Sequence, residues 1–290
     1  MRRLLLPLVV LCVAACDGPK EESASDALPQ RVILFGPNLT QTAVRLGHTD
    51  RIVAITDYCR WTASGPEPPR VGGMVDPDLE GIAAANPDLL VLQGRNDVLR
   101  SFARAQGIGV ADVKMDEGVD SVLRGIVRID SLLAGPESTR GVALADSLEA
   151  ELDALRRTMP DEAPTILLVI TRDPDTVRNL MTAGEGTFMD DLLRRVGARG
   201  WSATRGRGYF DVSLEELVAN PPDVVLEIES AGASDDPARW RAPWVDLLGD
   251  GVHVVRLTDP DALVPGPGIV GTARELAQLL RATVPDGDPR

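Results

Sequence analysis

Side chains that could catalyse a reaction or hold a metal ion are scarce in this chain. A zinc or manganese site needs several histidine and carboxylate ligands together, and the two histidines, His48 and His253, stand far apart in the sequence. The chain has no Gly-x-Ser-x-Gly turn, no phosphate-binding glycine-rich loop and no His-Glu-x-x-His pair. Nothing in the sequence brings a histidine beside Cys59 or a serine. The sequence therefore predicts neither an enzyme nor a resident metal site.

Aromatic side chains are the residues that could instead hold a ligand. They make up only 3% of the chain, so their placement is informative. Tyr58 and Trp61 flank Arg60 in one predicted loop, and Tyr209 adjoins Phe210 in another. Flat aromatic faces suit a large planar ligand, and polar tips suit the amide or carboxylate groups at its rim. For each aromatic residue taken singly, packing in the core is the alternative.

Two glutamates occupy the same place in a repeated unit. Glu80 precedes the run 87–92 and Glu215 precedes the run 222–227, and both runs begin Pro-Asp after six intervening residues. The offset is 135 residues from Glu80 to Glu215 and again from Pro87 to Pro222. Each copy predicts a short helix followed by a buried strand. A unit used twice predicts two similar lobes with a cleft between them, an architecture suited to binding.

The rest of the chain alternates short apolar runs with helical patterns, as α/β lobes with largely parallel sheets do. Further strands are expected at 32–35, 51–56, 165–170 and 252–257. Between the two copies, apolar residues spaced three and four apart predict one helix ending near 133 and a second from 137 to 159. The second helix, of about 22 residues, would be roughly 33 Å long and could connect the lobes.

The net charge and the first residues bear on partners and location. A formal net charge of −14 argues against nucleic acid, which needs clustered Lys and Arg. Arg2-Arg3, the apolar run 4–13 and Ala14-Ala15 form a targeting segment, too short to remain as a membrane span. Cys16 follows, and Val-Ala-Ala-Cys at 13–16 resembles the bacterial lipobox, in which that cysteine is acylated. An ordinary secretory leader with a chance cysteine is the alternative.

Several short tracts follow one another in a distinctive order. They are Asp57-Tyr58-Cys59, Pro69-Arg70-Val71-Gly72-Gly73, Pro77-Asp78-Leu79-Glu80, Asn86-Pro87-Asp88-Leu89-Leu90-Val91, Gly184-Glu185-Gly186-Thr187-Phe188-Met189 and Val212-Ser213-Leu214-Glu215. Behind a lipobox, this order resembles the substrate-binding proteins of ABC importers for iron-siderophore, haem and cobalamin, the helical-backbone metal receptors. The resemblance covers nearly all of residues 31–284. It implies two similar three-layer α/β lobes with central, largely parallel sheets, joined by one long rigid helix.

The resemblance also implies roles for particular residues. Glu80 and Glu215 would each dock against arginines of a membrane permease dimer, with Glu216 as an alternative in the second lobe. The other interpretation is that each glutamate only stabilises its helix N-terminus, by a few tenths of a kcal/mol. The ligand-binding candidates, expected in the cleft, are Tyr58, Arg60, Trp61, Met74, Phe188, Tyr209 and Phe210. Trp240 and Trp244 either cap this cleft or pack under a helix.

The ligand expected from the resemblance is a transported cobalt corrinoid, because Asp57-Tyr58-Cys59 with Val71-Gly72-Gly73 looks most like the cobalamin-receptor branch. Cobalamin receptors tend to carry an aromatic residue where Met74 stands, so haem and ferric siderophores stay open. A non-transport accessory or signalling protein that keeps the fold is a further alternative. The implied partners are an ABC permease dimer, its ATPase and, through lipid on Cys16, a membrane. No resident cofactor is expected, and the protein is expected to be a monomer.

The expected organisation follows from these patterns. The segments are a signal peptide at 1–15, a lipid-anchored flexible linker at 16–31, an N-terminal lobe at 32–133, an interlobe helix at 134–159 and a C-terminal lobe at 160–290. The protein would lie in the cell envelope, on the extracytoplasmic (periplasmic) side of a bacterial membrane.

Overall fold

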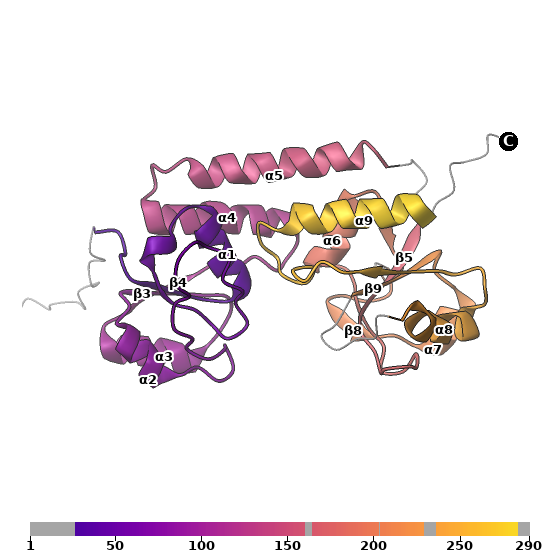
Figure 1. Ribbon diagram of the computed structural model, residues 1–290, viewed down its shortest axis with the longest axis horizontal. Coiled ribbons are helices and arrows are strands. Elements are labelled where there is room, and N and C mark those ends of the chain that lie inside the picture. The colour runs from indigo at the N-terminus through magenta and orange to yellow at the C-terminus, as the bar shows by residue number, and fades with distance from the viewer. Residues whose placement is uncertain (1–26, 160–163, 203, 229–235, 284–290) are drawn as a thin grey trace, which may run out of the picture.

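Two α/β lobes lie side by side along one layer of long helices (Figure 1). The computed structural model describes residues 27–159, 164–202, 204–228 and 236–283. The predicted signal peptide, Cys16 and most of the predicted linker lie outside these residues. Within the described ranges, no helix is long and apolar enough to cross a membrane.

The first lobe contains a four-stranded parallel sheet in the order β2-β1-β3-β4. Its elements are β1 (Val32–Phe35), α1 (Pro37–Arg45), the 3-10 turn η1 (Thr49–Arg51), β2 (Ile52–Ala54), α2 (Leu79–Ala85), β3 (Leu89–Leu92), α3 (Asp97–Gln106) and β4 (Gly109–Asp112). Every residue of β1 is buried, because helices cover both faces of the sheet. The wholly apolar run 32–35 is the expected sequence for such a strand.

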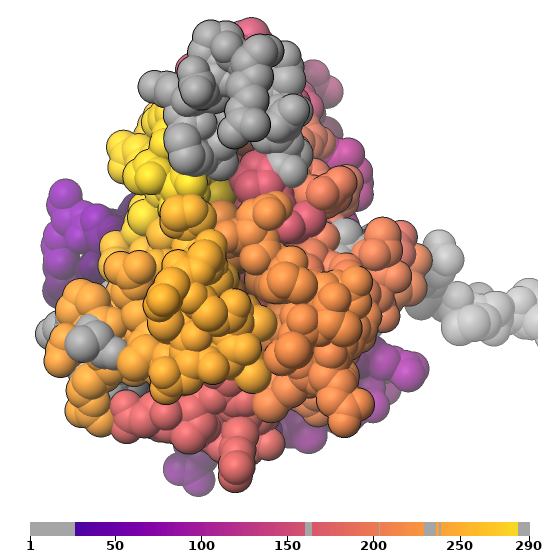
Figure 2. Space-filling model, turned by 90° about the vertical axis from the view of Figure 1, so that its right-hand side faces the viewer, coloured from indigo at the N-terminus to yellow at the C-terminus, as the bar shows by residue number. Residues whose placement is uncertain are grey.

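The second lobe has a mixed sheet in the order β10-β9-β5-β6-β8, with β7 also pairing with β5. Its elements are β5 (Thr165–Thr171), β6 (Met181–Ala183), α6 (Phe188–Arg195), β7 (Arg199–Gly200), β8 (Tyr209–Asp211), α7 (Leu214–Ala219), β9 (Val224–Ile228), α8 (Pro237–Leu248), β10 (His253–Leu257) and α9 (Ile269–Thr283). Strand β6 runs antiparallel to both β5 and β8. Viewed from its outer end, this lobe shows yellow α9 above the orange surface that includes α7 and α8 (Figure 2).

Two long antiparallel helices, α4 (Val119–Ala134) and α5 (Arg140–Arg156), lie along the first lobe and reach the second. Helix α5 begins later than the predicted residue 137, because residues 136–137 form a turn and Thr139 is the N-cap of the helix. Near its C-terminal end, Thr158 Oγ1 accepts a hydrogen bond of 2.9 Å from Arg281 Nη1 of α9. An ion pair between Glu151 and Arg274 makes a second link to α9.

One hydrophobic core is shared by both lobes, and each lobe also has a core of its own. The shared cluster joins Leu34 of β1, Ile126 of α4, Leu148 of α5, Leu168 of β5 and Leu276 of α9. Two smaller clusters fill the opposite faces of the sheets, beneath α2 and α3 in the first lobe and beneath α7 and α8 in the second. Close-packed side chains resist relative movement, so the shared cluster makes the lobe–lobe arrangement stiff.

The sequence repeat is also a structural repeat. Helix α2 leads into β3, and α7 leads into β9, as the doubled pattern predicts. In both copies the aspartate after the proline accepts a backbone hydrogen bond near the start of the strand that pairs with the repeat's own strand. Asp88 Oδ2 accepts a 2.7 Å hydrogen bond from Gln30 N, just before β1, and Asp223 Oδ2 accepts a 2.7 Å hydrogen bond from Thr165 N, at the start of β5.

Candidate ligand-binding site

Loops that follow the strands of the two lobes meet at one junction. Arg60 of the first lobe and Asp261 of the second form an ion pair with an N–O distance of 3.6 Å. The loop that carries Asp261 is fixed to α9, because Glu275 accepts hydrogen bonds from Thr258 N at 2.7 Å and from Asp259 N at 3.0 Å. The junction is therefore bounded by anchored backbone on the side of the second lobe.

Tyr58 stands on a tightly bonded double loop of the first lobe. Asp57 N donates to Gly72 O at 3.1 Å, and Arg70 donates to the carbonyl oxygens of Thr56 and Cys59 at 3.2 and 3.1 Å. The Tyr58 side chain itself is 77% exposed. The first lobe thus presents a solvent-facing aromatic ring on rigid backbone.

The two neighbours of Tyr58 singled out by the sequence have different surroundings. Trp61 is half-buried and packs against the shared core. Cys59 is buried, and its Sγ lies 3.1 Å from Thr56 Oγ1 and 3.4 Å from Thr40 Oγ1, so the thiol is satisfied by hydroxyl groups. Within the described residues, no group of three or more His, Cys, Asp or Glu side chains is arranged to hold a metal ion.

Tyr209 and Phe210 lie in the edge strand β8 rather than in a loop. Phe210 pairs with Thr182 and Tyr209 with Ala183 of β6. Tyr209 is 52% exposed. Loss of surrounding water raises the pKa of its phenol, and the negative charge of Asp116, from the first lobe, raises it further. The Tyr209 phenol therefore keeps its proton at neutral pH.

Met74 and Phe188 do not join these aromatic residues. Met74, a predicted ligand contact, is half-buried and packs with the core beneath α2 and α3. Phe188 was predicted to bind ligand, but it is 2% exposed and belongs to the shared core. As the first residue of α6, after the capping Thr187, its ring turns inward. Phe188 is therefore a core residue in this structure.

Glu80 and Glu215 are exposed in the first turns of α2 and α7, which lie far from the long helices (Figure 1). Asp78 caps α2 by accepting a 2.9 Å hydrogen bond from Gly81 N. Ser213 caps α7 by accepting a 3.4 Å hydrogen bond from Glu216 N. Glu216 forms an ion pair with Arg205 at 2.9 Å, whereas Glu215 has no ion-pair partner among the described residues. The second-lobe glutamate available to a partner is thus Glu215.

A buried charged cluster at the carboxyl ends of β5, β9 and β10 was not predicted. Glu227 accepts from Arg172 Nε at 2.6 Å, from Arg256 Nη2 at 3.2 Å and from Trp244 Nε1 at 2.7 Å. Arg256 also stacks over the Trp240 ring, 4.4 Å from its centroid. Trp244, a residue of α8, is fully buried in the core of the second lobe and does not cap a cleft. Only the folded sheet brings these distant residues together, so no local sequence signal marks them.

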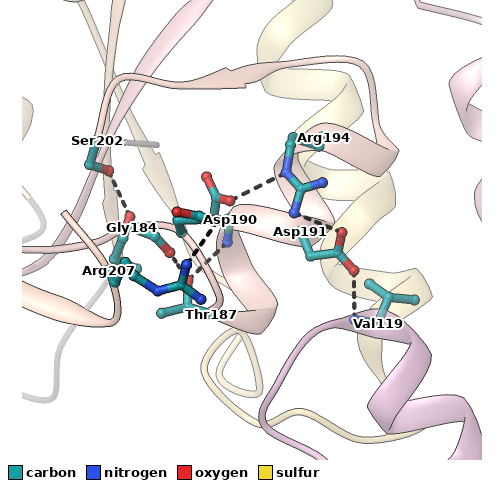
Figure 3. A network of polar contacts seen from close by, with 10 residues as sticks. Val119, Gly184, Thr187, Asp190, Asp191, Arg194, Ser202 and Arg207 are labelled. Atoms are coloured by element: carbon teal, nitrogen blue, oxygen red, sulfur yellow. Dashed lines mark hydrogen bonds and ion pairs between the residues drawn. The ribbon is translucent and has the colours of Figure 1, made fainter. Parts of the chain in front are cut away.

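A second polar network joins the lobes where α6 meets the start of α4 (Figure 3). Asp191 Oδ2 accepts a 2.8 Å hydrogen bond from Val119 N and so caps α4 from the other lobe. Arg194 bonds Asp191 at 3.1 Å and Asp190 at 3.3 Å. Asp190 is 1% exposed, and burial raises the pKa of its carboxyl, an effect that Arg194 only partly offsets. This network supports lobe orientation rather than ligand contact.

The two histidines have separate surroundings. His48 is buried, and its Nε2 lies 3.2 Å from Asp130 Oδ1. Burial lowers the pKa of the His48 imidazole, against the opposing effect of the hydrogen bond to Asp130. His253 is exposed at the start of β10 in the second lobe.

The structure has two α/β lobes connected by the long helices α4, α5 and α9, and loops at the strand ends of the two lobes meet at one junction. This arrangement defines the class of two-lobed α/β binding proteins. The family model for "Periplasmic binding protein" matches residues 32–236, and the chain belongs to that family. It is a solute-binding family with an extracytoplasmic location, as the sequence interpretation expected.

Named relatives and solved structures agree with this family. The chain is 21% identical over 264 residues to the vitamin B12-binding protein of Pectobacterium carotovorum subsp. carotovorum, covering 91% of this chain and 92% of that protein. The periplasmic haem-binding protein HutB of Vibrio cholerae has the same fold, with a TM-score of 0.75 and 21% identity over 87% of this chain and 98% of that one. The periplasmic vitamin B12-binding protein BtuF of Vibrio cholerae follows with a TM-score of 0.68 and 22% identity over 88% and 98%.

Proposed function

We propose that this chain captures a cobalt corrinoid between its lobes and delivers it to an ABC permease. Tyr58 and Tyr209 would contact the ligand from opposite lobes, with Arg60 and Trp61 beside Tyr58. Relatives named for vitamin B12 or cobalamin binding support the ligand class. The anchored loops at the junction support a site that is largely formed before the ligand arrives.

The charged residues near these aromatic residues favour a corrinoid over an anionic ligand. Arginines within a few residues of these aromatic residues already have acidic partners: Arg60 with Asp261, Arg205 with Glu216, and Arg207 with Glu185 at 3.2 Å. Arg70, which donates hydrogen bonds to the loop that carries Tyr58, pairs with Glu67 at 2.5 Å. Asp116 adds negative charge near Tyr209. A corrinoid rim is lined by neutral amides, whereas haem carries two carboxylates and many siderophores are anionic. A site with its arginines neutralised favours the amide-rimmed ligand.

Calorimetry with the mature chain tests the ligand. Cobalamin and cobinamide should bind saturably at micromolar concentration or below, and haem and ferric siderophores should bind at least tenfold more weakly, about 1.4 kcal/mol. Tyr58→Ala and Tyr209→Ala should each weaken corrinoid binding. Gly251→Ala provides a control far from both aromatic residues in the sequence. Failure of every ligand to bind would refute capture of this ligand class.

Haem is the second candidate, because two tyrosines with exposed phenols could supply an oxygen ligand to ferric iron. Several solved neighbours are named for haem binding. A haem titration followed by absorbance distinguishes the two ligands. Tight, saturable haem binding that is lost in Tyr58→Phe or Tyr209→Phe, together with weak corrinoid binding, would replace the corrinoid proposal.

Docking is proposed to use Glu80 and Glu215, whose exposed carboxylates stand on matching helices. Glu80→Arg with Glu215→Arg should abolish ligand uptake in cells while the dissociation constant stays within twofold of the wild type. A matched control reverses two exposed charges on the side of the long helices, Glu137→Arg with Asp153→Arg. Normal uptake by the Glu80 and Glu215 double variant would contradict docking through these residues. An accessory protein without transport would show no dependence of uptake on the chain at all.

Lipid anchoring through Cys16 is a separate proposal that rests on the Val-Ala-Ala-Cys sequence. Metabolic labelling with a fatty-acid analogue should mark the wild-type chain and leave Cys16→Ser unlabelled. The variant should also leave the membrane fraction. A labelled Cys16→Ser chain, or an unlabelled wild type, would show that the segment is an ordinary secretory leader.

A further inference from the structure

Two glycines, one in each lobe, lie directly against aromatic rings. A Cβ atom built on Gly73 would lie 3.2 Å from Tyr58 Cε2 and 3.0 Å from Asp76 Oδ1. A Cβ atom built on Gly206 would lie 2.6 Å from Phe210 Cε1 and 2.7 Å from Phe210 Cδ1. Neither glycine has a positive φ, so any residue could adopt its backbone conformation. At Gly206 the space taken by the Phe210 ring calls for glycine, and at Gly73 the Tyr58 ring and the Asp76 carboxylate together take that space.

In the first lobe, the missing side chain of Gly73 leaves room for the Tyr58 ring. The loop before it is bonded to the loop that carries Tyr58, through Asp57 N to Gly72 O at 3.1 Å and Val71 N to Ile55 O at 3.0 Å. Backbone beneath the ring is therefore fixed. Gly73 lies against the Cδ2–Cε2 side of the ring, and because Tyr58 is 77% exposed, the rest of the ring is open for stacking on a ligand.

In the second lobe, the Phe210 ring rests on Gly206 and also on Gly184, whose added Cβ would lie 2.7 Å from Phe210 Cε1. Neighbouring side chains in a strand point to opposite faces. Holding Phe210 against these glycines therefore turns Tyr209 to the other face of β8. That is the residue whose charge environment includes Asp116 of the first lobe.

We propose that Gly73 and Gly206 are positioning residues that hold an aromatic ring of each lobe for a flat ligand. Gly73 would seat Tyr58 directly, and Gly206 would seat Phe210 and thereby orient Tyr209. This inference rests on the proposed binding of a planar macrocycle between the lobes. The two glycines would belong to the binding site although they make no side-chain contact with the ligand.

Alanine substitutions test both seats. Gly73→Ala and Gly206→Ala should each weaken cobinamide or cobalamin binding about 3- to 10-fold, the range expected when an aromatic contact is lost. Gly206→Ala should have the larger effect, because its Cβ would approach the ring more closely. Gly251→Ala is the matched control: no other atom lies within 4 Å of its added Cβ, and its φ is not positive. The control should bind as the wild type does.

A double-mutant cycle separates positioning from general destabilisation. In a Tyr58→Ala background, Gly73→Ala should cause no further loss of affinity, because the ring that it would displace is absent. An equal loss in both backgrounds, or no loss in either, would overturn the assignment of Gly73. For Gly206, the double variant Gly206→Ala with Phe210→Leu should bind the ligand as tightly as Phe210→Leu alone does. The smaller leucine side chain leaves room for the added methyl group. No recovery would overturn the assignment of Gly206.

A structural readout keeps the inference testable if no macrocycle binds. Crystal structures of the wild type, Gly73→Ala and Gly206→Ala should show the Tyr58 and Phe210 rings displaced only in the respective variants. Rings that stay in place would refute the seats. Displaced rings without binding of any ligand by the wild type would instead uphold the seats and refute the proposed function.

Discussion

The two lobes share a helix–strand repeat but differ at the strand ends that border the junction. The first lobe keeps a wholly parallel sheet, and its strand ends carry a neutral pair in which Asn38 Nδ2 donates to Gln93 Oε1 at 2.6 Å. The second lobe adds antiparallel strands β6 and β8 and buries Glu227 between two arginines. The exposed tyrosine of the first lobe, Tyr58, therefore lies in a loop, whereas that of the second lobe, Tyr209, lies in an edge strand.

Removing the central polar side chain from each of these sites should produce very different losses. Glu227→Ala leaves two buried guanidinium groups without their shared carboxylate and should lower the free energy of unfolding by about 3–5 kcal/mol. Gln93→Ala removes one neutral hydrogen bond and should cost about 1 kcal/mol. Urea unfolding measures both. Equal losses would show that the charged cluster is no more important to its lobe than the amide pair is to the other.

Removing the hydrogen bond that links the two lobes should cause the next largest loss of unfolding free energy. Asp191→Ala removes the cap from α4 and should cost about 1–2 kcal/mol, with faster hydrogen exchange at the amides of 119–121. Asp120→Ala removes only an exposed ion pair with Arg195 at the same place, so it should cost a few tenths of a kcal/mol. Unchanged exchange at these amides in Asp191→Ala would contradict capping across the lobes.

The caps of the repeated helices allow a smaller comparison. Asp78→Ala should cost about 1 kcal/mol and Ser213→Ala about 0.5 kcal/mol, because the first hydrogen bond is 2.9 Å long and the second 3.4 Å. Thermal melting of both variants against the wild type would measure the difference. A larger loss from Ser213→Ala would reverse the ranking of the two caps.

The smallest expected effect is the response of each lobe to acid. The pKa of His48 is lowered in the folded state from an ordinary value of 6.5, so the unfolded chain takes up a proton first as pH falls. Stability should therefore fall from about pH 6.5 downward until the lowered pKa is reached. Asp190 has a raised pKa, so its protonation on acidification should add stability.

Unfolding free energies measured from pH 7.5 to pH 4.5 test these signs. His48→Gln should flatten the fall below pH 6.5, and Asp190→Asn should remove the opposing gain at lower pH. His253→Gln serves as the control histidine, exposed in the other lobe. A His48→Gln profile parallel to that of the wild type would show that this buried pair does not set the acid response.

Much of the fold could be predicted because the deciding signals are local. The apolar run 32–35 and the doubled Leu-Glu and Pro-Asp units indicated buried strands and short helices, and the structure confirms them. Gly47 and Gly197, just past the ends of α1 and α6, have φ values of 84° and 85°, as is typical of a glycine that ends a helix. The domain boundaries and the roles of the site residues remain predictions.

The site was harder to predict because it depends on residues distant in the sequence. Phe188 follows a capping threonine, and only the packing of α6 against the shared core shows that its ring turns inward. Helix α8 contains Pro243, which cannot donate a backbone hydrogen bond, and that residue obscured the helix that buries Trp244. Edge strand β8 has only three residues, too few for a periodic signal.

The core shared by the lobes also has a kinetic consequence for the proposed ligand. If Leu34, Ile126, Leu168 and their neighbours stay packed throughout binding, no slow conformational step precedes or follows the encounter. Association in a stopped-flow experiment should then follow a single exponential, and its observed rate should rise linearly with ligand concentration. Differences in affinity between ligands would appear in the rate at which each one leaves.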